Sequence, residues 1–196
     1  LSLAAPTRQL VRDLARRLQP PLVLDGDGLT AVAEELDVLR KRTAPTVLTP
    51  HPGEMARLTG QSIAAIQDDP IGVLRRTCDD LRAIIVLKGA HSLIGLPGGP
   101  VYVNLSGNSG MASAGVGDVL AGTVAAMACQ LPDLGDAVRA AVLLHGAAGD
   151  RAAEARGEDG VVAGDVGAGA VAGDGGASGE AGRAGGGFPR RGVGWC

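Results

Sequence analysis

Short, continuous apolar runs alternate along the chain with longer segments in which apolar residues recur every three or four positions. The runs predict buried strands of a parallel sheet at residues 22–25, 46–49 and 84–88. The periodic segments predict helices over 7–18 and 30–42, and a further helix after the Asp69-Pro70 cap. Strands that alternate with helices in this way are typical of an α/β fold.

The second half of the body continues with a hairpin and two small-residue helices. Residues 92–96 and 101–103 flank a Pro-Gly-Gly-Pro turn and predict a hairpin at the margin of the sheet. A polar, glycine-rich loop then leads into an apolar helix at 119–131. A last helix begins at Asp133 or Asp136, and we interpret His145 within it as a packing or solvent-facing residue rather than a ligand.

Composition limits the chain to one globular domain with an aliphatic core. Of its 196 residues 45% are hydrophobic, 20% charged and 2% aromatic, so the core must be built from Ala, Val, Leu and Ile. From about residue 164 glycine and alanine dominate without apolar periodicity. The expected domain therefore spans 1–165, and 166–196 is expected to be a disordered Gly/Ala-rich tail without a function of its own.

Charge and cysteine usage exclude several classes of protein. A net charge of −3 with almost no aromatic side chains argues against nucleic acid as a partner. The apolar runs are too short to span a membrane, and the N-terminus has no signal-peptide pattern. Three widely spaced cysteines form neither a disulfide framework nor a zinc pattern, so we expect a reducing, cytoplasmic environment.

Polar residues follow each predicted strand, at the sheet edge where doubly wound folds bind ligands. Asp25 and Asp27 follow the first strand and are read equally well as turn formers or as binding residues. His51 stands between two prolines after the second strand, which favours a ligand contact. The segment 88–92 follows the third strand at the same edge.

The loop 104–117 contains four glycines directly before an apolar helix. Glycines allow backbone N–H groups to converge, and a helix N-terminus favours negative charge, so the loop can hold a nucleotide phosphate. Asp118 at the helix start is a candidate base directed toward the bound ligand. The simpler alternative is a tight turn with an Asp cap.

Four separated motifs resemble those of one family. Val-Leu-Asp-Gly-Asp-Gly-Leu, Leu-Thr-Pro-His-Pro-Gly-Glu-Met, Val-Leu-Lys-Gly-Ala and Asn-Leu-Ser-Gly-Asn-Ser-Gly-Met-Ala-Ser-Ala-Gly-Val-Gly-Asp stand in the order found in the ADP/ATP-dependent NAD(P)H-hydrate dehydratases. The resemblance implies a ribokinase-like, three-layer α/β fold with a mostly parallel central sheet flanked by helices. It also implies a metabolite-repair lyase that removes water from hydrated NADH and NADPH at the expense of a nucleotide.

The resemblance assigns roles to individual positions. His51 would contact the hydrated nicotinamide, and Asp118 would be the catalytic residue that reaches the substrate hydroxyl. ADP or ATP, expected with Mg²⁺, would be bound by the loop after the third strand and by the Gly-Val-Gly-Asp turn. The residues concerned are Lys88, Gly89, Ala90, His91, Ser92 and Gly117. No protein ligand for the metal is assigned.

The chain also departs from the family pattern. Ser109, Ala114 and Val116 replace the usual Pro, Gly and Ser of the glycine loop. The early part of the domain, with residues that help bind substrate, is expected to be missing. An incomplete sheet edge would favour association, so we expect a homo-oligomer. Two alternatives to the dehydratase are a small-molecule kinase of the same superfamily and a nucleotide-binding fragment without turnover.

Overall fold

The computed structural model describes residues 4–172 and places their strands in one mixed sheet. The strand order follows the chain: β1 (Leu22–Leu24), β2 (Thr46–Leu48), β3 (Ile84–Leu87), β4 (Leu93–Gly95) and β5 (Val101–Val103). β1, β2 and β3 are parallel, with Val23 opposite Val47 and Leu48 opposite Ile85. β4 and β5 form the expected antiparallel hairpin beside β3. The α/β class is thus confirmed, with parallel and antiparallel pairings in one sheet.

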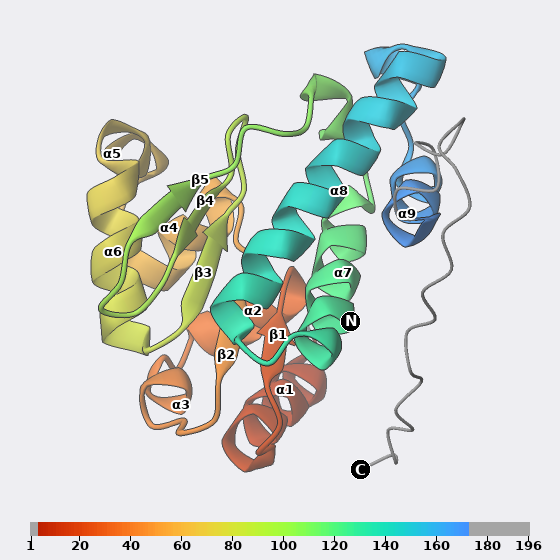
Figure 1. The fold of residues 1–196 in the computed structure, drawn as a ribbon. Helices are drawn as coiled ribbons and strands as arrows, with labels where there is room; N and C mark the ends of the chain where they lie inside the picture. Colours follow the sequence, from red (N-terminus) through yellow and green to blue (C-terminus); the bar gives the residue numbers. More distant parts are fainter. Residues whose placement is uncertain (1–3, 173–196) are drawn as a thin grey trace, which may run out of the picture.

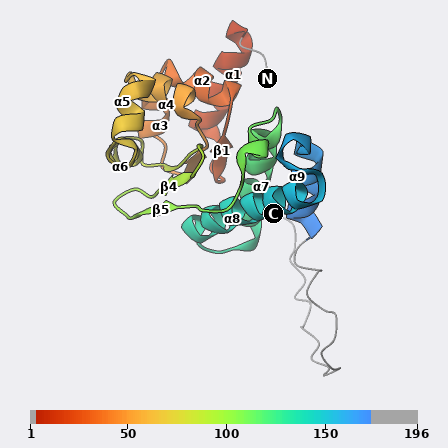
Figure 2. The same ribbon diagram turned by 90° about the horizontal axis from the view of Figure 1, so that it is seen from above.

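Helices cover both faces of this sheet (Figures 1 and 2). The first face carries α1 (Ala5–Arg17), α2 (Asp27–Ala33), α3 (Asp37–Arg40), α4 (Pro52–Thr59), α5 (Ile63–Asp68) and α6 (Pro70–Leu81). The second face carries α7 (Val116–Gln130) and α8 (Leu134–Arg156). Short 3₁₀ turns at Ser109–Met111 and Glu158–Gly160 precede α7 and follow α8.

Two apolar cores result from the alternation of side chains along the strands. Leu48 and Ile85 point into the core beneath α1 to α6, whereas Val47 and Val86 point into the core beneath α7 and α8. Neighbouring residues of a strand face opposite sides, so one apolar run supplies both cores. All four side chains are fully buried.

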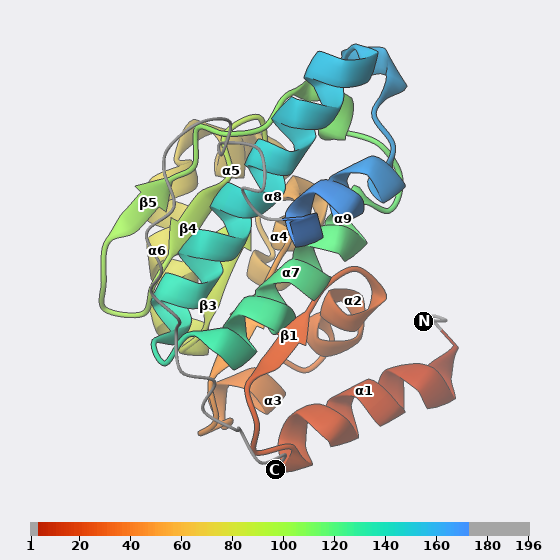
Figure 3. The same ribbon diagram turned by 45° about the vertical axis from the view of Figure 1, so that its right-hand side comes forward.

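The last described helix, α9 (Ala163–Ala172), packs beside α7 and α8 (Figure 3). Val166 is fully buried in a third apolar cluster with Val116 of α7 and Ala148 of α8. The expected domain boundary at residue 165 therefore falls inside a packed helix, because tertiary burial compensates for the low helix propensity of its glycines. Residues 173–196 of the expected tail lie outside the described residues.

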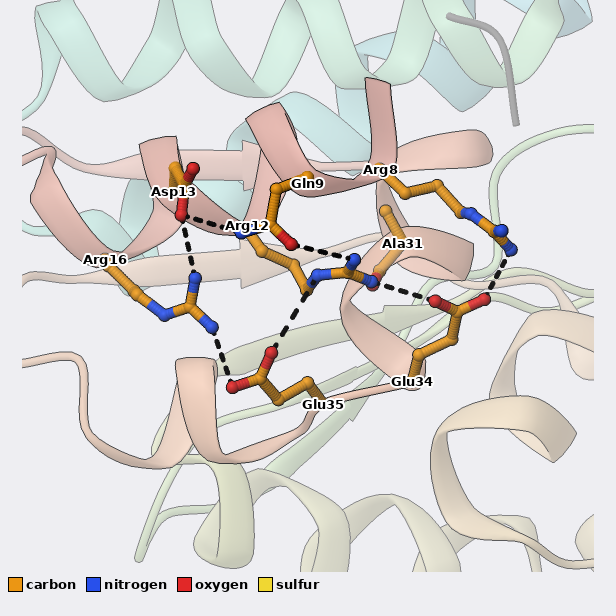
Figure 4. Close-up of polar contacts among 8 residues, drawn as sticks. All are labelled: Arg8, Gln9, Arg12, Asp13, Arg16, Ala31, Glu34 and Glu35. Atoms are coloured by element: carbon orange, nitrogen blue, oxygen red, sulfur yellow. Dashed lines mark hydrogen bonds and ion pairs between the residues drawn. The ribbon is translucent and has the colours of Figure 1, made fainter. Parts of the chain in front are cut away.

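Arginines on α1 attach it to the loop that follows α2 (Figure 4). Arg8 and Arg12 pair with Glu34 at 2.5 and 2.8 Å, and Arg16 pairs with Glu35 at 2.7 Å. Both glutamates lie between α2 and α3, where the periodicity had predicted one continuous helix over 30–42. That part of the prediction is wrong, because the chain leaves the helix at Glu34 and turns before it restarts at Asp37.

The described helices include no membrane-spanning candidate, since none combines sufficient length with sufficient apolarity.

Candidate functional site

A cavity of about 670 Å³ lies beyond the carboxyl ends of β2 and β3, between the hairpin and helices α7 and α8. This volume is within the range of small-molecule pockets, and the position is the one at which open α/β sheets bind ligands. Its lining from the early loops and α7 consists of His51, Lys88, Gly89, Ala90, Ser92, Val116, Gly117 and Leu120. The remaining lining comes from residues 104–112 and from Val142, His145 and Gly146 of α8.

Most of the residues assigned from the sequence therefore meet in one place, but two do not line the cavity. Asp118 is exposed in the first turn of α7 and stands outside the lining. Successive helical residues are rotated by about 100°, so Gly117 can line the cavity while Asp118 beside it does not. His91 is exposed in the loop between β3 and β4, whereas its neighbours Ala90 and Ser92 line the cavity.

His51 is held by a capping box at the start of α4. Its Nδ1 accepts the backbone N–H of Gly53 at 2.9 Å and that of Glu54 at 3.3 Å. The Glu54 carboxylate in turn accepts the backbone N–H of His51 at 2.8 Å. Since Nδ1 is an acceptor, the neutral form of the ring carries its proton on Nε2, which lies 3.6 Å from Glu54 Oε1. The prolines on either side are thus only part of the reason why the ring is fixed.

Lys88 is the central charge of the site and contacts two carboxylates. Its Nζ lies 2.7 Å from Asp25 Oδ1 and 3.9 Å from Glu54 Oε2. The exposed fractions of the three side chains are 23%, 13% and 7% for Lys88, Asp25 and Glu54, so the group is largely removed from water. A Cβ added to Gly117 would lie 3.2 Å from Lys88 Nζ, so the start of α7 lies directly against the ammonium group.

The sequence pattern left the role of Asp25 open, and Glu54 appeared there only as part of the Pro-His-Pro-Gly-Glu motif. Both side chains balance the Lys88 ammonium, and Glu54 also orients His51. The Pro-His-Pro-Gly-Glu spacing contained the signal, because an N-cap residue followed three positions later by Glu is the pattern of a capping box. The contact between Asp25 and Lys88 joins residues 63 positions apart, and local patterns carry no signal for it.

His145 is the site residue that the sequence interpretation underestimated. The ring is buried against α7, with Nε2 2.9 Å from the carbonyl oxygen of Val116, and it lines the cavity. Burial lowers the pKa of this imidazole, as does the nearby Lys88 charge, while the bond to Val116 opposes the shift. The ring is therefore neutral at pH 7 and donates through Nε2 to the carbonyl. Its position in a small-residue helix correctly indicated packing, but that helix also forms a wall of the cavity.

Comparison with known proteins agrees with this geometry. Residues 4–171 match a family model described as NAD(P)H-hydrate dehydratase. The bifunctional NAD(P)H-hydrate repair enzyme Nnr of Thermofilum pendens is 51% identical over 161 residues, which are 82% of this chain and 31% of that protein. The ADP-dependent (S)-NAD(P)H-hydrate dehydratase of Neisseria meningitidis is 37% identical over 156 residues, which are 78% of this chain and 53% of that protein.

Solved structures lead to the same family. The ADP/ATP-dependent NAD(P)H-hydrate dehydratase of Bacillus subtilis, co-crystallised with ATP and Mg²⁺, superposes with a TM-score of 0.77 at 30% identity, over 88% of this chain and 60% of that one. A ribokinase-like superfamily protein of Enterococcus faecalis gives a TM-score of 0.73 at 29% identity, over 86% and 57% of the two chains. The chain thus spans about a third to three fifths of the length of these relatives. It belongs to the NAD(P)H-hydrate dehydratase family and has that family's ribokinase-like α/β fold.

Proposed function

We propose that this chain binds ADP or ATP and uses it to remove water from hydrated NADH or NADPH. The observation that carries the proposal is that His51, the loop after Lys88 and the N-terminus of α7 line one cavity. A helix N-terminus flanked by a lysine suits the phosphates of a nucleotide. The names of the relatives from Neisseria meningitidis and Bacillus subtilis support the choice of substrate and nucleotide.

The proposed reaction makes a poor leaving group into a good one. Hydroxide leaves slowly from the hydrated nicotinamide, so a phosphoryl group is first transferred from the nucleotide to the substrate hydroxyl. Asp118 accepts the proton of the substrate hydroxyl as the hydroxyl oxygen attacks the terminal phosphorus, and the nucleotide departs one phosphate shorter. Phosphate then departs with the electrons of the C–O bond, and the adjacent ring carbon releases a proton to solvent, so that its C–H electrons form the C=C bond of NADH or NADPH. In this proposal a substrate bound at the rim of the cavity places its hydroxyl near Asp118, while His51 donates from Nε2 to the nicotinamide portion.

The proposal includes magnesium as a companion of the nucleotide, although the two nearest carboxylates stand outside the cavity lining. The described residues contain no cluster of three or more metal-ligating His, Cys, Asp or Glu side chains. Mg²⁺ is commonly held by one or two carboxylates together with phosphate oxygens, and Asp25 and Glu54 provide two carboxylates beside Lys88. When bound, the ion would neutralise charge on the phosphates.

We further propose a cytoplasmic location and a homo-oligomeric assembly.

Binding and turnover measured on the same preparation test the proposal. Calorimetry with ADP and ATP should show binding, and absorbance should report the formation of NADH from its hydrate. Asp118→Asn should lower turnover by about a hundredfold or more with little change in nucleotide affinity, as expected for loss of a general base. Asp136→Asn, an exposed acid in the first turn of α8, is the matched control and should retain turnover. Turnover of Asp118→Asn close to wild type would refute the assignment.

A further inference from the structure

One side of the cavity is formed by residues 104–112, which we call the wall loop. Seven cavity-lining residues belong to it: Asn104, Ser106, Gly107, Asn108, Ser109, Met111 and Ala112. Apart from the 3₁₀ turn at Ser109–Met111, the loop has no regular secondary structure. Its shape therefore depends on contacts with the rest of the molecule, which come from α8 and from the 3₁₀ turn at Glu158–Gly160.

Asp150 of α8 holds the centre of the wall loop through both carboxylate oxygens. Oδ2 accepts the backbone N–H of Gly107 at 2.9 Å, and Oδ1 accepts the side-chain N–H of Asn108 at 3.0 Å. The bond from Asp150 orients the Asn108 amide so that its Oδ1 accepts the N–H of Gly110 at 3.1 Å. Gly107 has φ +102°, a conformation that glycine adopts without strain. One carboxylate thus fixes a chain of three hydrogen bonds in the loop.

Glycines on the same side of α8 let the loop come close to the helix. A Cβ added to Gly146 would overlap Ser106 and lie 2.8 Å from its backbone carbon and oxygen. A Cβ added to Gly149 would lie 2.7 Å from Met111 Cγ. The Ser106 hydroxyl lies within hydrogen-bonding distance of the Leu143 carbonyl oxygen, at 3.2 Å. The loop therefore rests on the backbone of α8, where Asp150 is its charged contact, and Ser109 donates to the Glu158 carboxylate beyond the end of that helix.

We propose that Asp150 is a positioning residue, which keeps the wall loop in the conformation that forms the ligand cavity. It stands outside the cavity lining, so it acts through Gly107 and Asn108. The proposal rests on the proposed function for the identity of the ligand, but the anchoring of the loop is a property of the free protein. The two can therefore be tested separately.

Asp150→Asn is the informative change, because it preserves size and removes one acceptor. If the new amide keeps its oxygen toward Gly107, its NH₂ group faces the NH₂ group of Asn108, and two donors meet. Flipping Asn108 would restore that bond but would break the one to Gly110. A charge-assisted bond is lost in either case, so the ordered loop becomes less populated. Apparent affinity falls in proportion to that population, roughly tenfold, while kcat at saturation changes less.

Amide exchange and binding form the two arms of the test. In the free protein, exchange of the Gly107 amide, followed by NMR, should be roughly tenfold or more faster in Asp150→Asn than in wild type. Calorimetry should show roughly tenfold weaker binding of ADP or ATP, and KM should rise more than kcat falls. Asp136→Asn removes the same charge from α8 without a contact to the loop and should match wild type in both arms.

A reciprocal exchange separates anchoring from general damage to the fold. In the double variant Asn108→Asp with Asp150→Asn, residue 108 can accept from both Gly110 and residue 150, and residue 150 can accept from Gly107. All three bonds are rebuilt, so Gly107 protection should return to within about threefold of wild type. Unchanged Gly107 exchange in Asp150→Asn, or no recovery in the double variant, would overturn the proposal. A wild type that protects Gly107 but binds no nucleotide would refute only the proposed function.

Discussion

The close approach of the wall loop to α8 makes a quantitative prediction for two glycines in helical positions. Gly146 and Gly122 lie inside α8 and α7, so alanine should improve helix propensity equally at both. Their surroundings differ. A Cβ on Gly122 would have no heavy atom within 4 Å outside its own helix, whereas a Cβ on Gly146 would meet the backbone of Ser106 at 2.8 Å. The same substitution therefore separates helix propensity from overpacking.

The magnitudes follow from these contacts. Replacing a glycine in a helix interior by alanine stabilises by about 0.8–1 kcal/mol. At Gly146 the added methyl group must displace backbone atoms, and overpacking of this kind costs about 1–3 kcal/mol. Because backbone gives way less readily than a side chain, we expect a cost near the upper end. Gly122→Ala should thus be about 1 kcal/mol more stable than wild type and Gly146→Ala about 2 kcal/mol less stable.

Urea unfolding followed by circular dichroism gives both values, and thermal melts provide a second measure. For a protein of this size, 1 kcal/mol moves Tm by about 2–4 °C, so the two variants should melt about 6–12 °C apart. Gly146→Ala should also weaken nucleotide binding, because the displaced loop lines the cavity. If both variants gain the same stability, the loop does not rest on α8 and the reasoning is refuted.

Three further predictions concern other parts of the molecule. Burial lowers the folded-state pKa of the His145 imidazole below its unfolded value of about 6.5. As pH falls, the unfolded chain therefore takes up the proton first, and the free energy of unfolding decreases between about pH 7 and 5. His145→Gln should reduce this decrease. Unfolding curves of wild type and His145→Gln across this range test it, and equal slopes against pH would contradict it. Arg42→Ala should destabilise by about 3 kcal/mol in urea melts, because the buried guanidinium donates to three carbonyl oxygens, whereas exposed Lys41→Ala should have little effect. Gly89→Val should weaken nucleotide binding, because the new side chain would block the approach of phosphates to the backbone. It should leave Tm unchanged, since a Cβ at this position would meet only one backbone oxygen. Unchanged affinity by calorimetry would contradict the placement of the phosphates beside Gly89.

The sequence predicted those elements whose pattern and burial agree. The strands β1, β2 and β3 were found because each is a continuous apolar run that supplies two cores. The helix predicted over 30–42 was wrong because the chain turns between α2 and α3, where Glu34 and Glu35 pair with arginines on α1. Helix α9 was missed because its glycine content hides a buried Val166. For α9, tertiary burial overrides the low helix propensity of glycine.

The sequence predicted which loops meet at the candidate site, but not the contacts between residues far apart in the chain. The loops after β2 and β3 and the turn at Gly117 converge because parallel strands end at one edge of the sheet. What could not be read was how these loops contact one another. The pairing of Lys88 with Asp25 and the anchoring of Gly107 by Asp150 join residues 63 and 43 positions apart. No periodicity or spacing encodes such pairs.

The strand order has a consequence for how the molecule assembles during synthesis. Each described strand pairs with its neighbour in sequence, so the sheet can grow in the direction in which the ribosome supplies the chain. The described strands and the helices on their first face have all been synthesised once Val103 has emerged. The cavity, in contrast, needs α7, the wall loop and Asp150 of α8 together. We expect a nascent chain that is already folded on one face while its other apolar face is still uncovered, which is the interval in which a chaperone would be needed most.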